Sequence, residues 1–220
     1  MYESAEVIGT DLSPIQPSFV PPNVSFMVDD AEAEWTFNKK FDFINMRGMV
    51  GSFMDISKVI QRCYDNLKPG GWLEIPDVAW PMYADDETIE GSAVYKWSKL
   101  MVEAGAKLGR PLTNVQKYGQ MLRDSGFTNI SEKVFRWPIN DWPQDKHYKT
   151  LGLWARQNLL DGLQALSMKL FTLALGWKSE EVEVFLVDVR KEVMSRKIHG
   201  YYAVYDVYGQ KPISNLPESD

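Results

Sequence analysis

Residues 1–78 alternate short apolar segments that end on acidic residues with a segment of helical pattern, and this alternation limits the fold more than any other feature. The apolar segments are rich in Val, Ile and Phe, as expected for strands that are covered on both faces. Strands that alternate with helices are typical of parallel βαβ units, so the predicted fold class is α/β. The predicted strands are Glu6–Asp11, Val24–Ala31, Phe41–Asn45 and Leu67–Ile75, the last beginning as a helix end.

A helix is predicted between the third and fourth strands. Apolar residues recur at helical spacing from Ile56 to Leu67, and Pro69-Gly70-Gly71 is expected to end the helix. The single cysteine, Cys63, falls on its apolar stripe and is interpreted as a small buried hydrophobic residue.

After Asp77 the pattern becomes mainly helical. A polar, turn-like segment is expected at Pro81–Glu87, and the last third is expected to end in a polar, mobile tail. We treat residues 1–220 as one domain with four parts: 1–78, a helical insertion at 79–125, strands and helices at 126–208, and the tail at 209–220. The later predicted elements are helices at Ile89–Leu108, Asn114–Ser125 (capped by Thr113 and stopped at Gly126), Lys146–Leu175 and from Ser179 to about Gly200, and strands at Phe127–Trp137 and Tyr201–Tyr208.

Composition excludes several classes of function. The formal net charge is −6 and there is no run of basic residues, so binding to a nucleic-acid backbone is not expected as the primary role. We recognise no signal peptide, and no apolar run approaches the ~20 residues that a membrane helix needs. We therefore expect a protein of the cytoplasm, or of the nucleus if its role is regulatory, without membrane association.

Seven stretches carry a resemblance to a known family: GTDLSPIQP (9–17), NVSFMVDDAEAEW (23–35), FDFINMRGMVGSF (41–53), LKPGGWLEI (67–75), GFTNI (126–130), NDWPQDKH (140–147) and IHGYYAVYDVY (198–208). On these stretches the chain resembles fungal class I S-adenosylmethionine (SAM)-dependent methyltransferases of the LaeA-like group. The resemblance implies a Rossmann-like methyltransferase sheet with a helical lid, in which residues 1–78 are the remaining cofactor-binding half. It also implies a role in secondary metabolism.

The resemblance implies SAM as cofactor and suggests which residues hold it. Asp11, with Leu12 beside it, would accept hydrogen bonds from the ribose hydroxyls. Asp30, with Ala31 beside it, would accept one from the adenine amino group. Arg47 would lie at the mouth of the crevice that open α/β sheets form at the carboxyl ends of their strands.

Each of these assignments has a structural alternative. An acidic residue at a strand end commonly caps a helix or belongs to a turn, which would account for Asp11 and for the pair Asp29–Asp30. Arg47 could form a surface ion pair with Asp42 or Asp55.

The acceptor substrate is expected against a lid formed by residues 80–114 and by the helices after Lys146, which are rich in Trp, Tyr and Met. Trp35 could be a wall for adenine, although core packing is the more frequent fate of a tryptophan. The candidate substrate-pocket residues are Trp80, Tyr83, Trp97 and Trp154.

No catalytic base can be named from the sequence. His147 lies at the start of a predicted helix, where capping or surface exposure is the expected role. His199 lies at the end of another predicted helix, where the helix dipole accounts for it. Two histidines and one cysteine at these spacings do not form a metal site, and there is no Ser-centred nucleophile motif or P-loop.

No G-x-G-x-G motif occurs in the chain. In the family that motif follows a central first strand, which would precede Met1, and residues 1–4 resemble the end of the helix that follows it. We expect one of three outcomes: the second strand moves into the central place, a second copy or a methyltransferase partner supplies a strand, or the chain is a truncated form of a longer protein.

Three functions follow from the sequence. The first is methyl transfer from SAM to a small molecule, largely by proximity. The second is cofactor-independent cyclisation or rearrangement of a polyketide or terpenoid intermediate on the same fold. The third is a non-catalytic role as partner of a full-length methyltransferase or of a regulatory complex. We rank an enzyme of methyltransferase descent first.

Overall fold

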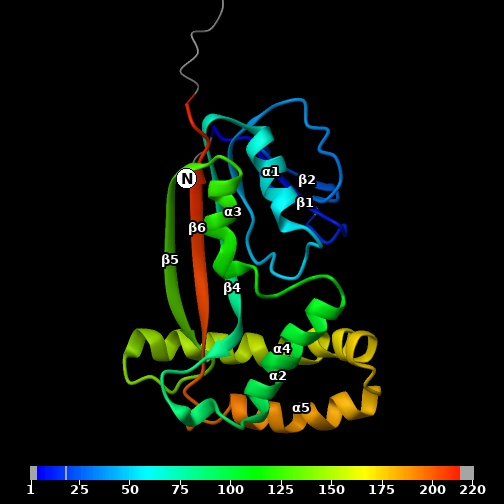
Figure 1. The fold of residues 1–220 in the computed structure, drawn as a ribbon, viewed down its shortest axis with the longest axis vertical. Helices are drawn as coiled ribbons and strands as arrows, with labels where there is room; N and C mark the ends of the chain where they lie inside the picture. Colours follow the sequence, from blue (N-terminus) through cyan, green and yellow to red (C-terminus); the bar gives the residue numbers. More distant parts are fainter. Residues whose placement is uncertain (1–3, 18, 214–220) are drawn as a thin grey trace, which may run out of the picture.

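The computed structural model describes residues 4–17 and 19–213, and it confirms the α/β fold class. The strands form two sheets (Figure 1). β1 (Val7–Asp11) and β2 (Val24–Val28) pair in parallel, with Val7 opposite Val24 and Asp11 opposite Val28. The larger sheet has the order β3-β4-β6-β5 and consists of β3 (Phe41–Asn45), β4 (Leu67–Tyr83), β6 (Tyr201–Gln210) and β5 (Thr128–Pro138).

β4 organises the larger sheet. β3 lies parallel to it on one side, and β6 lies antiparallel to it on the other. Side chains of β4 alternate between the two faces, as a strand requires, and the residues on one face are buried under helices: Leu73, Ile75, Asp77 and Ala79. β5 then pairs antiparallel with β6 at the outer edge.

The helices lie in two places (Figure 1). α1 (Ile56–Asn66) and α3 (Tyr118–Asp124) lie beside the upper part of the sheet, while α2 (Ala93–Lys107), α4 (Lys146–Leu175) and α5 (Ser179–Val193) gather at the lower end of the long strands. Short 3-10 turns at Glu87–Ile89 and Val115–Lys117 precede α2 and α3. Three helices begin where a side chain caps free backbone N–H groups: Asp55 for α1, Ser92 for α2 and Asp145 for α4.

Two apolar cores result from this arrangement. The first lies between α1, α3 and the sheet and includes Val59, Cys63, Ile75 and Leu122. The second lies among α2, α4, α5 and the lower end of β4, around Trp97, Leu163 and Leu186. Cys63 is fully buried and burial raises the pKa of its thiol to about 12, which confirms its prediction as a buried hydrophobic residue.

Most predicted elements are present, and β3 and α4 have the predicted bounds. The turn predicted from Pro81 is wrong for Pro81–Tyr83, because β4 continues to Tyr83 and buries Trp80 and Met82 in the second core. Pro69-Gly70-Gly71 does not end α1: the helix stops at Asn66, and β4 already begins at Leu67.

Three boundary predictions also need correction. Thr113 caps no helix, because the turn at Val115–Lys117 precedes an α3 that begins only at Tyr118. α5 ends at Val193, so Lys197–Gly200 lie beyond it. Gly209 and Gln210 belong to β6 and pair with Leu73 and Trp72, not to a tail. Residues 1–3 and 214–220, for which we predicted a helix end and a mobile tail, lie outside the described residues.

Among the described helices none is both long and apolar enough to cross a membrane.

Candidate functional site

A cavity of about 580 Å3 lies between β1 and β3. Its volume is within the range of small-molecule sites, about 300–1,000 Å3. One wall comes from Ile8–Asp11 of β1, and the opposite wall from β3 and the segment that follows it. The remaining lining residues include Phe26, Asp29, Ala31, Trp35 and Phe37.

The two walls are strand edges. Within the described residues, β1 pairs with β2 alone and β3 pairs with β4 alone, so each strand has one unpaired edge. Glu6 and Lys39, which precede β1 and β3, form an ion pair at 3.4 Å, and Asp11 and Arg47, at or beyond the other ends, both line the cavity. β1 and β3 therefore run in the same direction, with their carboxyl ends at the same end of the cavity.

Three of the five predicted cofactor-binding residues line the cavity: Asp11, Ala31 and Arg47. Leu12 and Asp30 are not among its lining residues. β2 ends at Val28, earlier than predicted, and the Asp29 N–H continues the ladder by donating to the Asp11 carbonyl at 3.0 Å. Asp29 lines the cavity, whereas the residue after it, Asp30, does not.

Both aspartates also make the turn contacts of the structural alternative. Asp11 Oδ1 accepts a hydrogen bond from the Ser13 N–H at 2.8 Å, and Asp30 Oδ1 accepts one from the Glu32 N–H at 2.9 Å. Both side chains are exposed, so each still has a free carboxylate oxygen for a ligand.

Arg47 lines the cavity and brings a positive charge to it. The two carboxylates considered as its partners are engaged elsewhere, Asp42 with Lys68 at 2.9 Å and Asp55 with Lys58 at 3.2 Å. Among the described residues no carboxylate lies within 4.0 Å of its guanidinium. Its charge is therefore free to meet an anionic ligand.

Sequence reasoning missed most of the apolar lining of the cavity. Trp35 lines it and also packs against the first core. Its Nε1 donates to the Ala31 carbonyl at 3.1 Å, and its ring meets Phe37 edge-on. The cluster of aromatic residues at 35, 37, 41 and 43 was the available signal. The other apolar lining residues are Phe26, Phe41, Phe43, Ile44, Met46, Met49 and Phe53.

The side chain of Glu32 connects the β1–β2 unit to the rest of the molecule. Its carboxylate accepts hydrogen bonds from the N–H groups of Met54 and Asp55, at 2.8 and 3.1 Å, and pairs with Arg110 at 3.7 Å. Arg110 in turn donates to the Ser52 carbonyl. These contacts attach the segment that follows β3 to the segment that follows β2.

A second carboxylate beside that segment is buried. Asp77 is 2% exposed and accepts hydrogen bonds from the N–H groups of Met49 and Val78, at 3.0 and 2.8 Å, and from the Tyr118 hydroxyl at 3.3 Å. Burial raises the pKa of the Asp77 carboxyl above its ordinary value, although the hydrogen bonds act to lower it. Burial and the neighbouring Asp77 also raise the pKa of the Tyr118 hydroxyl.

The predicted substrate-pocket residues are not gathered in one cavity. Trp97 is fully buried and donates to the Ser167 hydroxyl at 2.8 Å, and Trp80 packs against it with ring centroids 5.4 Å apart. Tyr83 stacks on Tyr201, and Trp154 is 73% exposed on α4.

Neither histidine faces the cavity. The His147 ring is exposed in the first turn of α4, as expected. His199 is not at a helix end, because α5 ends six residues earlier; its Nδ1 lies 2.6 Å from Asp86 Oδ2. Hydrogen bonds from Thr88 and His199 lower the pKa of Asp86 to about 2. Among the described residues no group of His, Cys, Asp and Glu could hold a metal ion.

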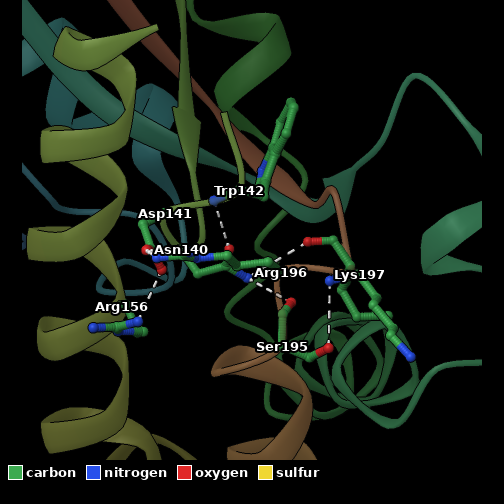
Figure 2. Close-up of polar contacts among 8 residues, drawn as sticks. Asn140, Asp141, Trp142, Arg156, Ser195, Arg196 and Lys197 are labelled. Carbon is green, nitrogen blue, oxygen red and sulfur yellow. Dashed lines mark hydrogen bonds and ion pairs between the residues drawn. The ribbon is translucent and has the colours of Figure 1, made fainter. Parts of the chain in front are cut away.

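The motif NDWPQDKH forms a polar junction at the end of β5, away from the cavity. Figure 2 shows Asp141 between Arg156 of α4 and Arg196, which follows α5. Asp141 is 3% exposed; its Oδ1 accepts from Arg156 at 2.9 Å and its Oδ2 from Arg196 Nε at 2.8 Å. Asn140 donates to the Ser195 carbonyl and accepts from the Trp142 N–H. These contacts join the sheet to the helices.

Comparison with known proteins gives a consistent set of relatives. A family described as "Methyltransferase domain" matches residues 2–132. The chain is 37% identical to the probable methyltransferase tdiE of Emericella nidulans over 99% of its length and 68% of that protein's length. It is 38% identical to the methyltransferase pytC of Aspergillus terreus over 94% of this chain and 64% of pytC. It is 32% identical to the secondary metabolism regulator laeA of Monascus pilosus over 97% of this chain and 59% of laeA. The chain thus spans about three fifths to two thirds of these relatives.

Solved structures show the same fold at low identity. The [4+2]-cyclase SpnF matches with a TM-score of 0.53 and 16% identity over 96% of this chain and 68% of its own. The cyclopropane synthase MmaA2 from Mycobacterium tuberculosis matches with a TM-score of 0.53 and 15% identity over 94% of this chain and 70% of its own.

Proposed function

Because this chain belongs to the family of methyltransferase domains, as its match over residues 2–132 and its relatives establish, we propose that it binds SAM and transfers the methyl group to a small molecule. The observation that carries this proposal is the cavity at the carboxyl ends of β1 and β3, where the carboxylate of Asp11 and the guanidinium of Arg47 lie beside an aromatic wall. Open α/β sheets bind ligands at such strand ends.

The residues present suit the chemical groups of SAM. The exposed carboxylate of Asp11 and the half-buried carboxylate of Asp29 can accept hydrogen bonds from ribose hydroxyls. Trp35 and Phe37 offer flat apolar faces for adenine. Arg47 can pair with the carboxylate of the methionine moiety. When bound, SAM supplies an electrophilic methyl group on a sulfonium; the chain contributes binding, orientation and exclusion of water.

The relatives support a role in secondary metabolism. Since tdiE and pytC are described as methyltransferases and laeA as a regulator of secondary metabolism, we place this chain in fungal secondary metabolism. A polyketide- or terpenoid-type acceptor is part of our proposal. The activity of the whole protein remains part of the proposal, because the chain spans only part of each relative. A nuclear location would follow if its role is regulatory.

A titration with SAM and with S-adenosylhomocysteine tests cofactor binding. We expect one site for each ligand. Asp11→Ala is expected to weaken both about 10- to 100-fold, because hydrogen bonds to a charged group contribute about 1.5–3 kcal/mol. Asp42→Ala is the matched control: Asp42 is an exposed carboxylate paired with Lys68, and it does not line the cavity. Isothermal titration calorimetry measures the dissociation constants of the wild type, Asp11→Ala and Asp42→Ala.

Two results would contradict this proposal. If the folded wild type binds neither ligand, methyl transfer by this chain is excluded, and cofactor-independent cyclisation or a non-catalytic partner role takes its place. If Asp11→Ala binds as tightly as Asp42→Ala, the ribose assignment is wrong.

We further propose that a strand from a second copy of the chain, or from a methyltransferase partner, pairs with the cavity-facing edges of β1 and β3 and leaves SAM the carboxyl ends of these strands, where Asp11 and Arg47 lie. Within the described residues both edges are unpaired, and two such parallel strands can accept a strand between them. Val7 donates to the Asn23 carbonyl, so Val7, Gly9 and Asp11 direct their backbone groups to β2, while Ile8 and Thr10 direct theirs to the free edge.

Thr10→Pro should therefore block this pairing and leave β1–β2 intact, because proline removes the N–H of the free edge only. We expect the wild type and Thr10→Ala, which retains the N–H, to form dimers as concentration rises, and Thr10→Pro to remain monomeric. Light scattering coupled to size-exclusion chromatography measures the molar mass of each protein as its concentration rises. A wild type that stays monomeric, and that captures no added methyltransferase relative, would contradict the strand-pairing proposal.

A further inference from the structure

The segment Met46–Phe53, which we call the cavity segment, forms part of the cavity wall and is hydrogen-bonded to β4. Its lining residues are Met46, Arg47, Met49 and Phe53. Met46 N–H donates to the Glu74 carbonyl at 2.9 Å, and Gly48 N–H donates to the Pro76 carbonyl at 3.0 Å. Up to this point the backbone of β4 holds the segment.

At Met49 the hydrogen-bond acceptor is a side chain of β4 and no longer a backbone carbonyl. The Met49 N–H donates to Asp77 Oδ2 at 3.0 Å. Met49 is half-buried and the Asp77 carboxylate is 2% exposed, so water has little access to this bond, and its loss would leave a buried carboxylate without one of its donors. The Asp77 carboxylate is thus the acceptor that determines where the cavity segment leaves the sheet.

Tyr118 links this carboxylate to the helices. It is 1% exposed at the start of α3, and its hydroxyl donates to the same oxygen, Oδ2, at 3.3 Å. Asp77 Oδ1 is engaged by its neighbour's N–H, that of Val78. Both oxygens are therefore used, and the three donors come from the cavity segment, β4 and α3.

We infer that Asp77 and Tyr118 are positioning residues: they fix the cavity segment so that Arg47 and Met49 face the ligand. The consequence for SAM binding rests on the function proposed above, whereas the fixing of the segment does not. Neither residue lines the cavity, so each acts through the segment it holds.

The two side chains can be changed without removing their bulk. Asn in place of Asp77 keeps the shape of the side chain but offers one acceptor oxygen to the three donors. Its NH2 group then faces at least one of these donors and cannot accept from it. Phe in place of Tyr118 removes the hydroxyl alone. Both variants should leave the apolar packing of the first core in place.

Hydrogen exchange of the ligand-free protein tests the positioning role directly. We expect peptides covering residues 46–53 to exchange about tenfold faster in Asp77→Asn, and less so in Tyr118→Phe, since loss of about 1.4 kcal/mol of local stability is a factor of ten. The control is Ser167→Ala, which removes a fully buried hydroxyl bonded to Trp97 in the second core. Ser167→Ala should lower the global stability about as much as Asp77→Asn does. It should not accelerate exchange at residues 46–53 more than elsewhere. Unchanged exchange there in both Asp77→Asn and Tyr118→Phe would overturn the inference.

Titration with S-adenosylhomocysteine tests the consequence for the ligand. Asp77→Asn is expected to weaken binding about tenfold, while Ser167→Ala should bind as the wild type does. If the wild type does not bind this probe, the proposed function fails, and hydrogen exchange still decides the positioning role. If Asp77→Asn exchanges faster but binds with unchanged affinity, the segment is held by Asp77 but does not position the ligand, which overturns the functional half of the inference.

Discussion

Gly152→Ala is expected to lower the free energy of unfolding by about 3 kcal/mol or more. A Cβ atom at this position of α4 would lie 2.6 Å from the carbonyl carbon of Asn140, closer still to its oxygen, and 3.2 Å from the Asp141 nitrogen. These are backbone atoms at the junction in Figure 2, so no flexible side chain can move aside. Overpacking of this kind costs about 1–3 kcal/mol, and more where the backbone must shift.

The same helix offers the matched control. A Cβ at Gly162 would meet only the side chain of Leu166, at 3.6 Å, an ordinary contact. Gly162→Ala should therefore stabilise the protein by up to about 1 kcal/mol through helix propensity. Urea denaturation of the two variants should give shifts of opposite sign. If Gly152→Ala is as stable as the wild type, α4 does not approach Asn140 as closely as described.

The second large effect is expected for Asp141→Ala, which should destabilise the protein by about 2–3 kcal/mol. The Asp141 carboxylate is nearly buried and accepts charge-assisted hydrogen bonds from Arg156 and Arg196. A hydrogen bond to a charged group contributes about 1.5–3 kcal/mol. The arginine side chains are 31% and 67% exposed, so water partly replaces the lost carboxylate and holds the cost below that of a fully buried pair.

The control for this variant is Asp188→Ala. Asp188 pairs with Lys191 at 3.2 Å, and both side chains are about two-thirds exposed. Exposed pairs contribute about 0–1 kcal/mol, so the change should be small. Equal destabilisation by the two substitutions would mean that the junction at Asp141 does not hold the helices to the sheet.

The pH dependence of this prediction has a definite sign. Arg196 first, and then Arg156, hold the pKa of the Asp141 carboxyl below its ordinary value. A carboxylate with a depressed pKa in the folded state stabilises the protein fully above the unfolded value, near 3.9, and loses that contribution as pH falls through the folded value. The stability difference between the wild type and Asp141→Ala should thus be constant above about pH 5 and shrink under more acidic conditions.

Local patterns predicted much of the fold because they depend on residues close in the sequence. The helix at Lys146–Leu175 begins where Asp145 can cap it, and the strand at Phe41–Asn45 has the predicted bounds. The errors occur where distant contacts override a local signal. Proline and glycine suggested a helix stop at 69–71 and a turn from Pro81, yet both stretches belong to β4. Gly70 and Gly71 form backbone hydrogen bonds with Lys211, and Trp80 and Met82 are buried in the second core.

The candidate site divides in the same way. The sequence by itself, through acids at strand ends and the resemblance they support, placed Asp11, Ala31 and Arg47 at what proved to be one cavity. Asp29 lines that cavity and Asp30 does not, because β2 ends at Val28, earlier than its pattern predicted. The sequence also grouped Trp80, Tyr83, Trp97 and Trp154. Trp80 and Trp97 do pack together in the second core, whereas Tyr83 stacks on Tyr201 and Trp154 is exposed on α4.

What the sequence determined about this protein is its alternation of strands and helices, its family and the acids at its strand ends, since these are properties of neighbouring residues. Only the tertiary structure decided that two strand edges face one cavity and that Asp77, Tyr118, Glu32 and Arg110 hold its wall. The physical reason is that these contacts join residues 20 to 80 positions apart, whose partners depend on how the sheets and helices pack.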